Sequence, residues 1–266
     1  MDMYMVGGAV RDEILGVPSK DIDFTCVLER ADIDAINAHN QFTPFEYMAL
    51  YLKGLGFTIF LETPEYLTVR AQFPDRDIPV PGSFPNSQLA IKRVKKGITA
   101  DFVLARKESD YTDGRRPDEV VPGTLEDDLA RRDFTMNAIA KDSNGNFIDP
   151  HNGRADIAKC VIRAVGDPFE RLTEDALRAV RALRFSVTKD FMIDADLRFA
   201  MQSAAVIHSI KDNISDERIK DELSKMFRFD TPASLIALQR FPILTSAIFA
   251  GKVSLDATLK TKGRGK

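Results

Sequence analysis

Two aspartates, Asp21 and Asp23, stand in a stretch with the pattern of a β-strand, DIDFTCVL over 21–28. Side chains alternate along a strand, so the two carboxylates share one face while Ile22 and Phe24 share the other. The apolar face has to be buried, which ties this strand to a sheet with a core on that side. Two carboxylates on the opposite face repel each other and do not stabilise the sheet, so the pattern indicates a functional role.

A divalent cation is the partner that suits such a pair. Mg²⁺ takes one or two carboxylates and fills its other positions with water and substrate phosphate. Two such ions about 3.5–4 Å apart can hold the attacking and leaving oxygens of a phosphoryl or nucleotidyl transfer. We therefore expect Asp21 and Asp23 to be metal ligands and catalytic residues, with Mg²⁺ as the cofactor.

A pair of glycines, Gly7 and Gly8, lies upstream of the acidic strand, and a helix is predicted directly after them, from Ala9 to Leu15. Glycine lets the backbone approach a phosphate closely, and a helix N-terminus offers free N–H groups and a positive dipole end. Arg11 in the first turn can reach the same anion. An ordinary tight turn is the alternative. The sequence has neither a P-loop nor a dinucleotide-binding fingerprint.

A third aspartate, Asp101, lies in another strand-like stretch, 98–105. Ala100 and Phe102 belong to its apolar face and Asp101 to the opposite one. An unpaired carboxylate inside a strand is costly. If this strand pairs with 21–28, Asp101 joins the first two aspartates, where it can bind metal or accept the proton of an attacking hydroxyl. The alternative is an acid on an edge strand that faces water.

Composition and patterning favour an α+β protein of about two domains. The chain has 266 residues, of which 44% are hydrophobic and 29% charged, as is typical of soluble globular proteins. Strand and helix signals alternate in the first half, whereas helix signals dominate after about residue 150. We expect a head with a mixed sheet over 1–145, a helical neck over 146–230 and a short helical segment with a basic tail over 231–266.

Individual elements can be placed from the same signals. The expected strands are 21–28, 57–61, 66–73 and 98–105, and the expected helices are 32–54, 167–188, 194–208, 215–228 and 231–249. Asp167 and Pro168 mark a helix cap and a first-turn proline. Four prolines between 74 and 85 indicate a loop or inserted hairpin, and 107–123 has the composition of a polar loop.

Charge and cysteine content narrow the possible partners. The net charge of −3 provides no global basic field for nucleic acid, so RNA contact has to come from local patches such as Lys92–Lys96 and Lys252–Lys266. A solvated charge run is the alternative for both. The two cysteines and three histidines suggest neither a disulfide framework nor a zinc site. No signal peptide or membrane span is visible, so we expect a cytoplasmic protein without a membrane or obligate protein partner.

A basic and polar stretch, LARRDFTMNA over 129–138, has the residue types of a nucleotide site. Arg132 suits bidentate contact with a triphosphate. Asp133 fits a helix cap or a sugar contact, and Asn137 can hydrogen-bond ribose or phosphate.

A second candidate cluster begins at Asp175 and Arg178, which are expected to share a helix face at i, i+3, with Arg181 and Arg184 continuing the row. A carboxylate only accepts hydrogen bonds and a guanidinium only donates them. Cytosine and adenine present an amino donor beside a ring-nitrogen acceptor, so this pair can admit CTP and ATP. Guanine and uracil would leave both groups unpaired. A surface ion pair is the alternative.

Five motifs resemble those of the class II tRNA nucleotidyltransferase (CCA-adding) and poly(A) polymerase family of the polymerase-beta-like superfamily. They are VGGAVRD with KDIDF, RRDFTMNAIA, DPHNGRADI, EDALRAVRALRF and ERIKDELSKMF, in the family's order between residue 5 and about 227. The resemblance implies that Asp21 and Asp23 bind two Mg²⁺ ions and that Asp101 is the third carboxylate. It also implies nucleotide contacts from Gly8, Arg11, Arg132, Asp133 and Asn137, and base contacts from Asp175 and Arg178 with Arg181 and Arg184 nearby.

The resemblance implies a five-stranded nucleotidyltransferase head followed by a helical neck. The implied activity is addition of C and A to tRNA 3′ ends from CTP and ATP, with release of pyrophosphate. A poly(A) polymerase, a C-only or A-only adding enzyme, and a non-catalytic RNA-binding remnant are the alternatives. Only about forty residues follow the last motif, so we expect a truncated helical body with a reduced grip on tRNA. The insert at 74–96 is longer than the family pattern and is a candidate replacement contact for RNA.

Overall fold

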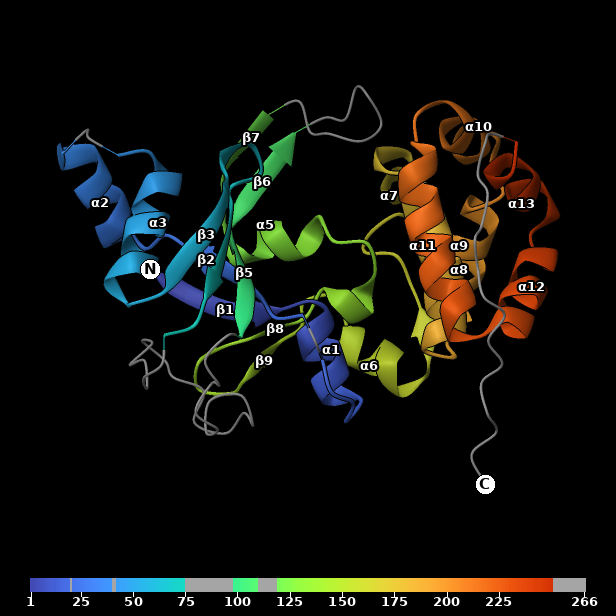
Figure 1. Ribbon diagram of the computed structural model, residues 1–266, viewed down its shortest axis with the longest axis horizontal. Helices are drawn as coiled ribbons and strands as arrows, with labels where there is room; N and C mark the ends of the chain where they lie inside the picture. Colours follow the sequence, from blue (N-terminus) through green and yellow to red (C-terminus); the bar gives the residue numbers. More distant parts are fainter. Residues whose placement is uncertain (20, 40–41, 75–97, 110–118, 251–266) are drawn as a thin grey trace. The chain divides into compact units, whose positions relative to one another are not determined.

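The computed structural model describes residues 1–19, 21–39, 42–74, 98–109 and 119–250 (Figure 1). The basic stretches Lys92–Lys96 and Lys252–Lys266 lie outside these residues, as do nearly all of the 74–96 insert and the middle of the loop predicted at 107–123. The chain forms two compact units. The first comprises Met1–Glu108, Glu119–Arg132 and Met136–Arg154, and the second comprises Ser109–Asp118, Asp133–Thr135 and Ala155–Lys266.

A seven-stranded mixed sheet organises the first unit, in the order β3-β4-β5-β2-β1-β8-β9. Its strands are β1 (Asp2–Val6), β2 (Asp23–Val27), β3 (Thr58–Thr63), β4 (Thr68–Gln72), β5 (Thr99–Leu104), β8 (Ala140–Lys141) and β9 (Phe147–Ile148). The β2–β5 pair is parallel and the other neighbours are antiparallel. The resemblance implied five strands; the β8–β9 hairpin adds two because β8 pairs with β1. A separate ribbon joins β6 (Arg106–Ser109) and β7 (Glu119–Pro122).

The strands follow the predicted alternation of apolar and polar faces. All four predicted strands are confirmed, with ends shifted by one or two residues. Along β5, Ala100 and Phe102 are buried while Asp101 on the opposite face is half-buried. The ring of Phe102 stacks on that of Phe24 with centroids 5.1 Å apart and meets Phe57 edge-on at 4.9 Å. This aromatic cluster anchors the strands that carry the aspartates, because burying such rings is strongly favourable.

Among its described residues, the first unit also contains the helices α1 (Gly8–Ile14), α2 (Arg30–His39), α3 (Pro44–Gly54) and α5 (Leu125–Ala130). In Figure 1, α3 packs against β3 and α2 packs against α3. The single helix predicted at 32–54 is wrong, since two helices occupy this stretch. The second begins at a capping box, in which Thr43 accepts from the Glu46 amide at 3.2 Å and the Glu46 side chain accepts from the Thr43 amide at 2.7 Å.

The second unit is mainly helical. Its helices are α7 (Pro168–Glu174), α8 (Leu177–Thr188), α9 (Ala195–Ala200), α10 (Ala204–Asp212), α11 (Asp216–Phe229), α12 (Thr231–Gln239) and α13 (Pro242–Ile248), and β10 (Val161–Ile162) pairs with β11 (Met192–Ile193). A further helix, α6 (Gly153–Ala158), spans the unit boundary. The predicted cap is confirmed, because Asp167 accepts from the amides of Phe169 at 2.8 Å and Glu170 at 3.0 Å.

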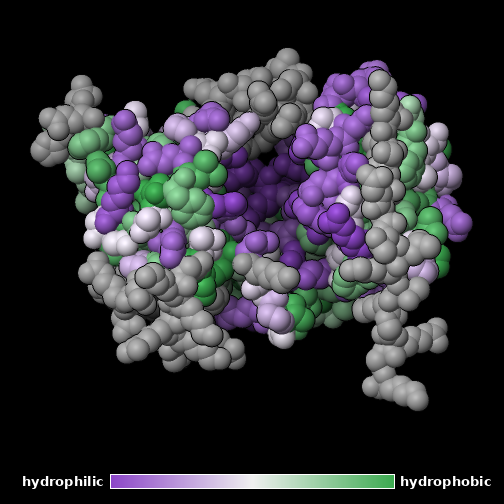
Figure 2. Space-filling view, in the orientation of Figure 1, coloured by the Kyte–Doolittle hydropathy of each residue, from purple (hydrophilic) through white to green (hydrophobic). Residues whose placement is uncertain are grey.

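Three predicted helices of the second unit are also divided in the structure. The 167–188 stretch breaks at Asp175, whose backbone is extended (φ −150°, ψ 100°). The 194–208 stretch breaks before Ser203, which caps α10, and 231–249 breaks before Pro242. Hydrophilic side chains cover α7 and α11, whereas apolar side chains gather over α12 and α13 (Figure 2). Within the described ranges, no helix has the length and apolar character needed to cross a membrane.

Candidate active site

The central strands of the sheet bring the three predicted carboxylates together. The β2–β5 register places Asp23 directly beside Asp101. Asp21 lies two residues before Asp23, just ahead of the first residue of β2, and is exposed. The pKa of Asp23 is raised above its ordinary value, by burial first and then by the negative charges of Asp101 and Asp21, while Arg132 opposes the shift. The suggestion that Asp101 lies on an edge strand is wrong, because β5 has neighbours on both sides.

Arg70 is a member of this group that the sequence reasoning missed. It lies on β4 directly opposite Asp101, and its guanidinium donates from Nε to Oδ1 and from Nη2 to Oδ2 at 2.6 Å each. Asp101 is therefore half of a bidentate ion pair instead of an isolated acid. The sequence did contain an indication of Arg70. This residue lies in a predicted strand between two apolar residues, Val69 and Ala71, which are both buried in the structure.

The donor set fits a hard divalent cation. All three side chains are carboxylates, and oxygen ligands are those that Mg²⁺ prefers. Among the described residues, no group of three or more His, Cys, Asp or Glu side chains is arranged to hold a metal by itself. Two carboxylates leave a coordination shell to be completed by water and phosphate, which is the usual way that Mg²⁺ is bound.

Gly7 closes the space beside the carboxylates. Its backbone (φ 70°, ψ −135°) lies in a region that other residues rarely adopt. A Cβ at this position would lie 2.9 Å from Nη1 of Arg132 and 3.7 Å from Oδ2 of Asp23. The turn between β1 and α1 therefore needs glycine for both its conformation and its close approach to Arg132 and Asp23.

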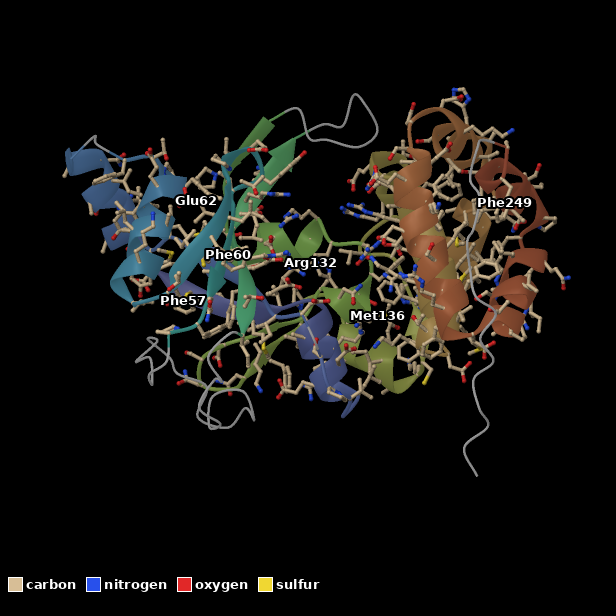
Figure 3. The ribbon with its side chains drawn as sticks, viewed as in Figure 1. Phe57, Phe60, Glu62, Arg132, Met136 and Phe249 are labelled. Atoms are coloured by element: carbon tan, nitrogen blue, oxygen red, sulfur yellow. The ribbon has the colours of Figure 1, made fainter. Side chains whose placement is uncertain are left out.

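A buried aspartate, Asp128 of α5, holds the basic side chains of this site. Its carboxylate accepts from the Thr25 hydroxyl and from Nη2 of Arg132, each at 2.8 Å, and it also pairs with Arg131. Burial alone would raise the pKa of Asp128, but Arg132, Arg131 and the Thr25 hydrogen bond outweigh it and hold that pKa well below its usual range. Arg132, labelled in Figure 3, also donates to the carbonyl oxygen of Asn137 at 3.3 Å. Its orientation is thus set before any ligand binds.

Two other predicted nucleotide contacts bind each other in the structure. Arg11 is buried and donates from Nη1 to Oδ1 of Asn137 at 2.6 Å. Arg11 also donates from Nε to Asp12 at 2.9 Å. Gly8 lies at the start of the same helix, where a Cβ would lie 3.5 Å from Nη2 of Arg11.

The second unit contains a second cluster of predicted site residues, which begins at Asp133. This buried carboxylate accepts from Nη2 of Arg181 at 2.6 Å and from its Nε at 2.9 Å. Glu222 of α11 accepts from Arg181 at 3.4 Å and pairs with Arg184. Asp133 therefore anchors Arg181, and Arg184 is held in place by an acid from a different helix.

The predicted row is wrong for Asp175, whereas Arg178, Arg181 and Arg184 do lie along one helix, α8. Asp175 lies before α8, where it accepts from the Leu177 amide at 3.1 Å and pairs with Nη2 of Arg218 at 2.7 Å. Arg178 instead pairs with Glu174 at 2.6 Å. The extended backbone at Asp175 removes it from the helical face.

Sequence reasoning gave no role to Arg218 or Glu222. Both lie on α11 within the motif ERIKDELSKMF. Their spacing of i, i+4 places them on one helix face, which was the available signal. The structure adds what spacing cannot show, namely that their partners are Asp175, Arg181 and Arg184.

Sequence comparison finds CCA-adding enzymes among the relatives of this chain. Residues 65–163 match the family model of the poly A polymerase head domain. The chain is 35% identical over 226 residues to the CCA-adding enzyme of Enterococcus faecalis. The aligned region covers 85% of this chain and 45% of the relative. The chain is 36% identical over 238 residues to the CCA-adding enzyme of Anoxybacillus flavithermus, and this alignment covers 89% and 49%. The chain thus spans about half the length of the curated relatives it matches.

Solved structures of a CCA-adding enzyme and a tRNA nucleotidyltransferase are also similar to this chain. The crystal structure of the Bacillus stearothermophilus CCA-adding enzyme in complex with CTP superimposes with a TM-score of 0.66 at 29% identity, covering 95% of this chain and 51% of the other. A tRNA nucleotidyltransferase complexed with a primer tRNA and an incoming ATP analogue gives 0.65 at 25% identity, covering 94% and 60%.

Proposed function

Because this chain belongs to the family of CCA-adding enzymes and poly(A) polymerases, we propose that it adds C and A to the 3′ end of tRNA from CTP and ATP. The observation that carries the proposal is the juxtaposition of Asp23 and Asp101 on paired strands, with Asp21 at the same strand end. Membership of this family implies use of a divalent metal ion. Related structures bind CTP, an ATP analogue and a primer tRNA.

In the proposed reaction, the RNA 3′-hydroxyl attacks the α-phosphate of the nucleotide and pyrophosphate leaves. Asp21 and Asp23 would hold Mg²⁺, which when bound stabilises the charge that develops on the phosphate oxygens. Arg132, already oriented by Asp128, would bind the triphosphate beside the Gly7 turn. Asn137 offers its amide to ribose or phosphate.

We assign recognition of the base to Asp175 and Arg178. Each is held by a partner, Asp175 by Arg218 and Arg178 by Glu174. A carboxylate has about four acceptor sites and a guanidinium five donors, so each group keeps capacity for a nucleobase. Asp175 would accept from the amino group of cytosine or adenine, and Arg178 would donate to the adjacent ring nitrogen.

Sequencing the reaction products tests the proposed addition of C and A to tRNA. The protein is incubated with tRNA that ends at the discriminator base, with CTP and ATP supplied separately and together. We expect CC from CTP alone and CCA from the mixture. Long A tails would identify a poly(A) polymerase, and addition of C alone or A alone would identify a partial enzyme. Absence of any product, together with retained tRNA binding, would favour the non-catalytic remnant.

Asp175→Asn is expected to change base selectivity more than triphosphate affinity. Asparagine keeps the shape and one acceptor oxygen, but it introduces a donor where the amino group of cytosine or adenine must donate. We expect discrimination against UTP and GTP to fall by about tenfold or more in competition assays with all four nucleotides. Asp212→Asn, an exposed acid of α10, is the control. Unchanged relative incorporation of the four nucleotides would contradict this role for Asp175.

Domain organisation and location follow the same interpretation. We propose that 1–145 is the catalytic head, 146–230 the neck that recognises the base and 231–266 a further segment that begins with helices α12 and α13. Both cysteines, the buried Cys26 and the exposed Cys160, are free thiols. That supports a reducing cytoplasm as the proposed location.

A further inference from the structure

Arg70 is a cation set in line with the predicted metal ligands. The β4–β5 register pairs Arg70 with Asp101, and the β5–β2 register pairs Asp101 with Asp23. Residues directly opposite on neighbouring strands project from the same face of a sheet. Arg70, Asp101 and Asp23 therefore form one row across three strands. We call these residues together with Asp21 the carboxylate row, which thus contains three aspartates and one arginine.

Stability of the sheet does not account for this arrangement. The side chain of Arg70 is 49% exposed, and an ion pair with that much solvent contact contributes little to folding. Its geometry is nevertheless bidentate, with both donor distances at 2.6 Å. A bidentate pair fixes the plane of the carboxylate as well as its position. The pair orients Asp101 beside Asp23, which is where function would require it.

The charge of Arg70 acts on all three aspartates of the carboxylate row. The pKa of Arg70 is raised, by its hydrogen bonds and charge interaction with Asp101 first and by Asp21 and Asp23 as well. Three carboxylates and one guanidinium sum to a charge of −2, where the carboxylates alone would carry −3. A row with the lower negative charge attracts a divalent cation less strongly.

We propose that Arg70 is a positioning residue that serves as the built-in counter-ion of Asp101 and so weakens the binding of divalent cations to the carboxylate row in the absence of nucleotide. The inference rests on the proposed function, because it takes these carboxylates to be the metal site. Its physical consequence is that nucleotide phosphates, rather than Asp101, supply the remaining negative charge. A cation then binds firmly when the nucleotide is present and is released with pyrophosphate.

Direct binding of Mn²⁺ without nucleotide, measured by electron paramagnetic resonance, tests the counter-ion role. Arg70→Gln raises the negative charge of the row to −3, and we expect about three- to tenfold tighter Mn²⁺ binding. Asp101→Asn lowers it to −1, and we expect weaker binding by a similar factor. The double variant restores −2 and should return to within about twofold of the wild type. Added salt should shrink these differences.

Two further variants separate charge from structure. Arg70→Lys keeps the charge without the bidentate geometry, so its Mn²⁺ affinity should stay close to that of the wild type while turnover falls. Lys53→Gln removes an exposed positive charge from the same unit, where it pairs with Glu62 on β3, and should change nothing. Circular dichroism melting of each variant confirms that it is folded. If Arg70→Gln does not fold, the Arg70→Lys and Asp101→Asn variants still test the counter-ion role.

The outcomes distinguish this inference from the proposed function. Mn²⁺ binding by the wild type with no tightening in Arg70→Gln would overturn the counter-ion role and leave the metal site standing. A double variant that binds more weakly than either single variant would also overturn it, since charge would not govern affinity. Absence of Mn²⁺ binding by the folded wild type would overturn both the metal site and the role of Arg70.

Discussion

Asp23→Asn is expected to reduce nucleotide incorporation by about a thousandfold or more. Such a loss corresponds to about 4 kcal/mol of transition-state stabilisation. It is of the size expected when the charge stabilisation supplied by a metal ion is lost, because asparagine replaces a negative ligand with a neutral one. Asp21→Asn should act in the same direction. Primer extension on tRNA under single-turnover conditions measures the effect.

The same Asp23 substitution should leave the fold as stable as before, or more so. The pKa of Asp23 is raised in the folded state, by burial first and then by Asp101 and Asp21. A carboxyl whose folded pKa lies above its unfolded value of about 3.9 contributes stability at low pH and loses it as pH rises through the folded pKa. Asparagine cannot ionise, so at pH 7 it removes that cost.

A matched control distinguishes the loss of a metal-binding carboxylate from the loss of any carboxylate in the same unit. Asp34→Asn removes an exposed carboxylate of α2 in the same unit, and incorporation should stay at the wild-type level. Thermal unfolding of all three variants gives the stability comparison. Normal incorporation by Asp23→Asn, or a cooperative unfolding transition shifted well below that of the wild type, would contradict the metal-ligand assignment.

The acidic strand and its partner could be predicted from sequence because both depend on local alternation. Ile22 and Phe24 are buried while Asp23 lies on the other face, as a period of two requires. Asp101 could be placed on a second strand by the same reasoning. That the two strands are neighbours was a conditional expectation, since pairing depends on the whole sheet and not on either segment.

The partners of these acids could not be predicted in the same way. The pairing of Arg70 with Asp101 depends on the β4–β5 register, which the insert between the two strands leaves undetermined in the sequence. The break at Asp175 was missed because the residues around it have good helix propensity. A tertiary ion pair with Arg218 stabilises an extended backbone there instead.

Asp128 shows how spacing can mislead. Its partners Arg131 and Arg132 lie at i+3 and i+4, a pattern typical of exposed helical ion pairs worth a few tenths of a kcal/mol. In the structure the carboxylate is fully buried, because α5 packs against β2 and the Thr25 hydroxyl reaches it. The sequence contains the pair, but only the packing of the helix on the sheet shows that it is internal.

Asp128→Ala is therefore expected to lower the free energy of unfolding by about 3–5 kcal/mol. Breaking a buried pair from one side leaves the remaining charges uncompensated. Here the side chains of Arg131 and Arg132 are 21% and 18% exposed, and the Thr25 hydroxyl loses its acceptor. Urea denaturation measures the loss. Glu126→Ala, an exposed acid on the same helix, should cost less than about 0.5 kcal/mol.

The Asp128 effect should also depend on pH with a defined sign. The pKa of Asp128 is depressed in the folded state, so its charge contributes stability above the unfolded value of about 3.9 and loses it as pH falls towards the folded pKa. The stability difference between the wild type and Asp128→Asn should thus be full near pH 7 and shrink below about pH 4. Incorporation should fall further than stability explains, because Arg132 would lose the partner that orients it towards the triphosphate. A difference that does not change with pH, or a loss no greater than that of Glu126→Ala, would show that the Asp128 carboxylate is not the anchor of this site.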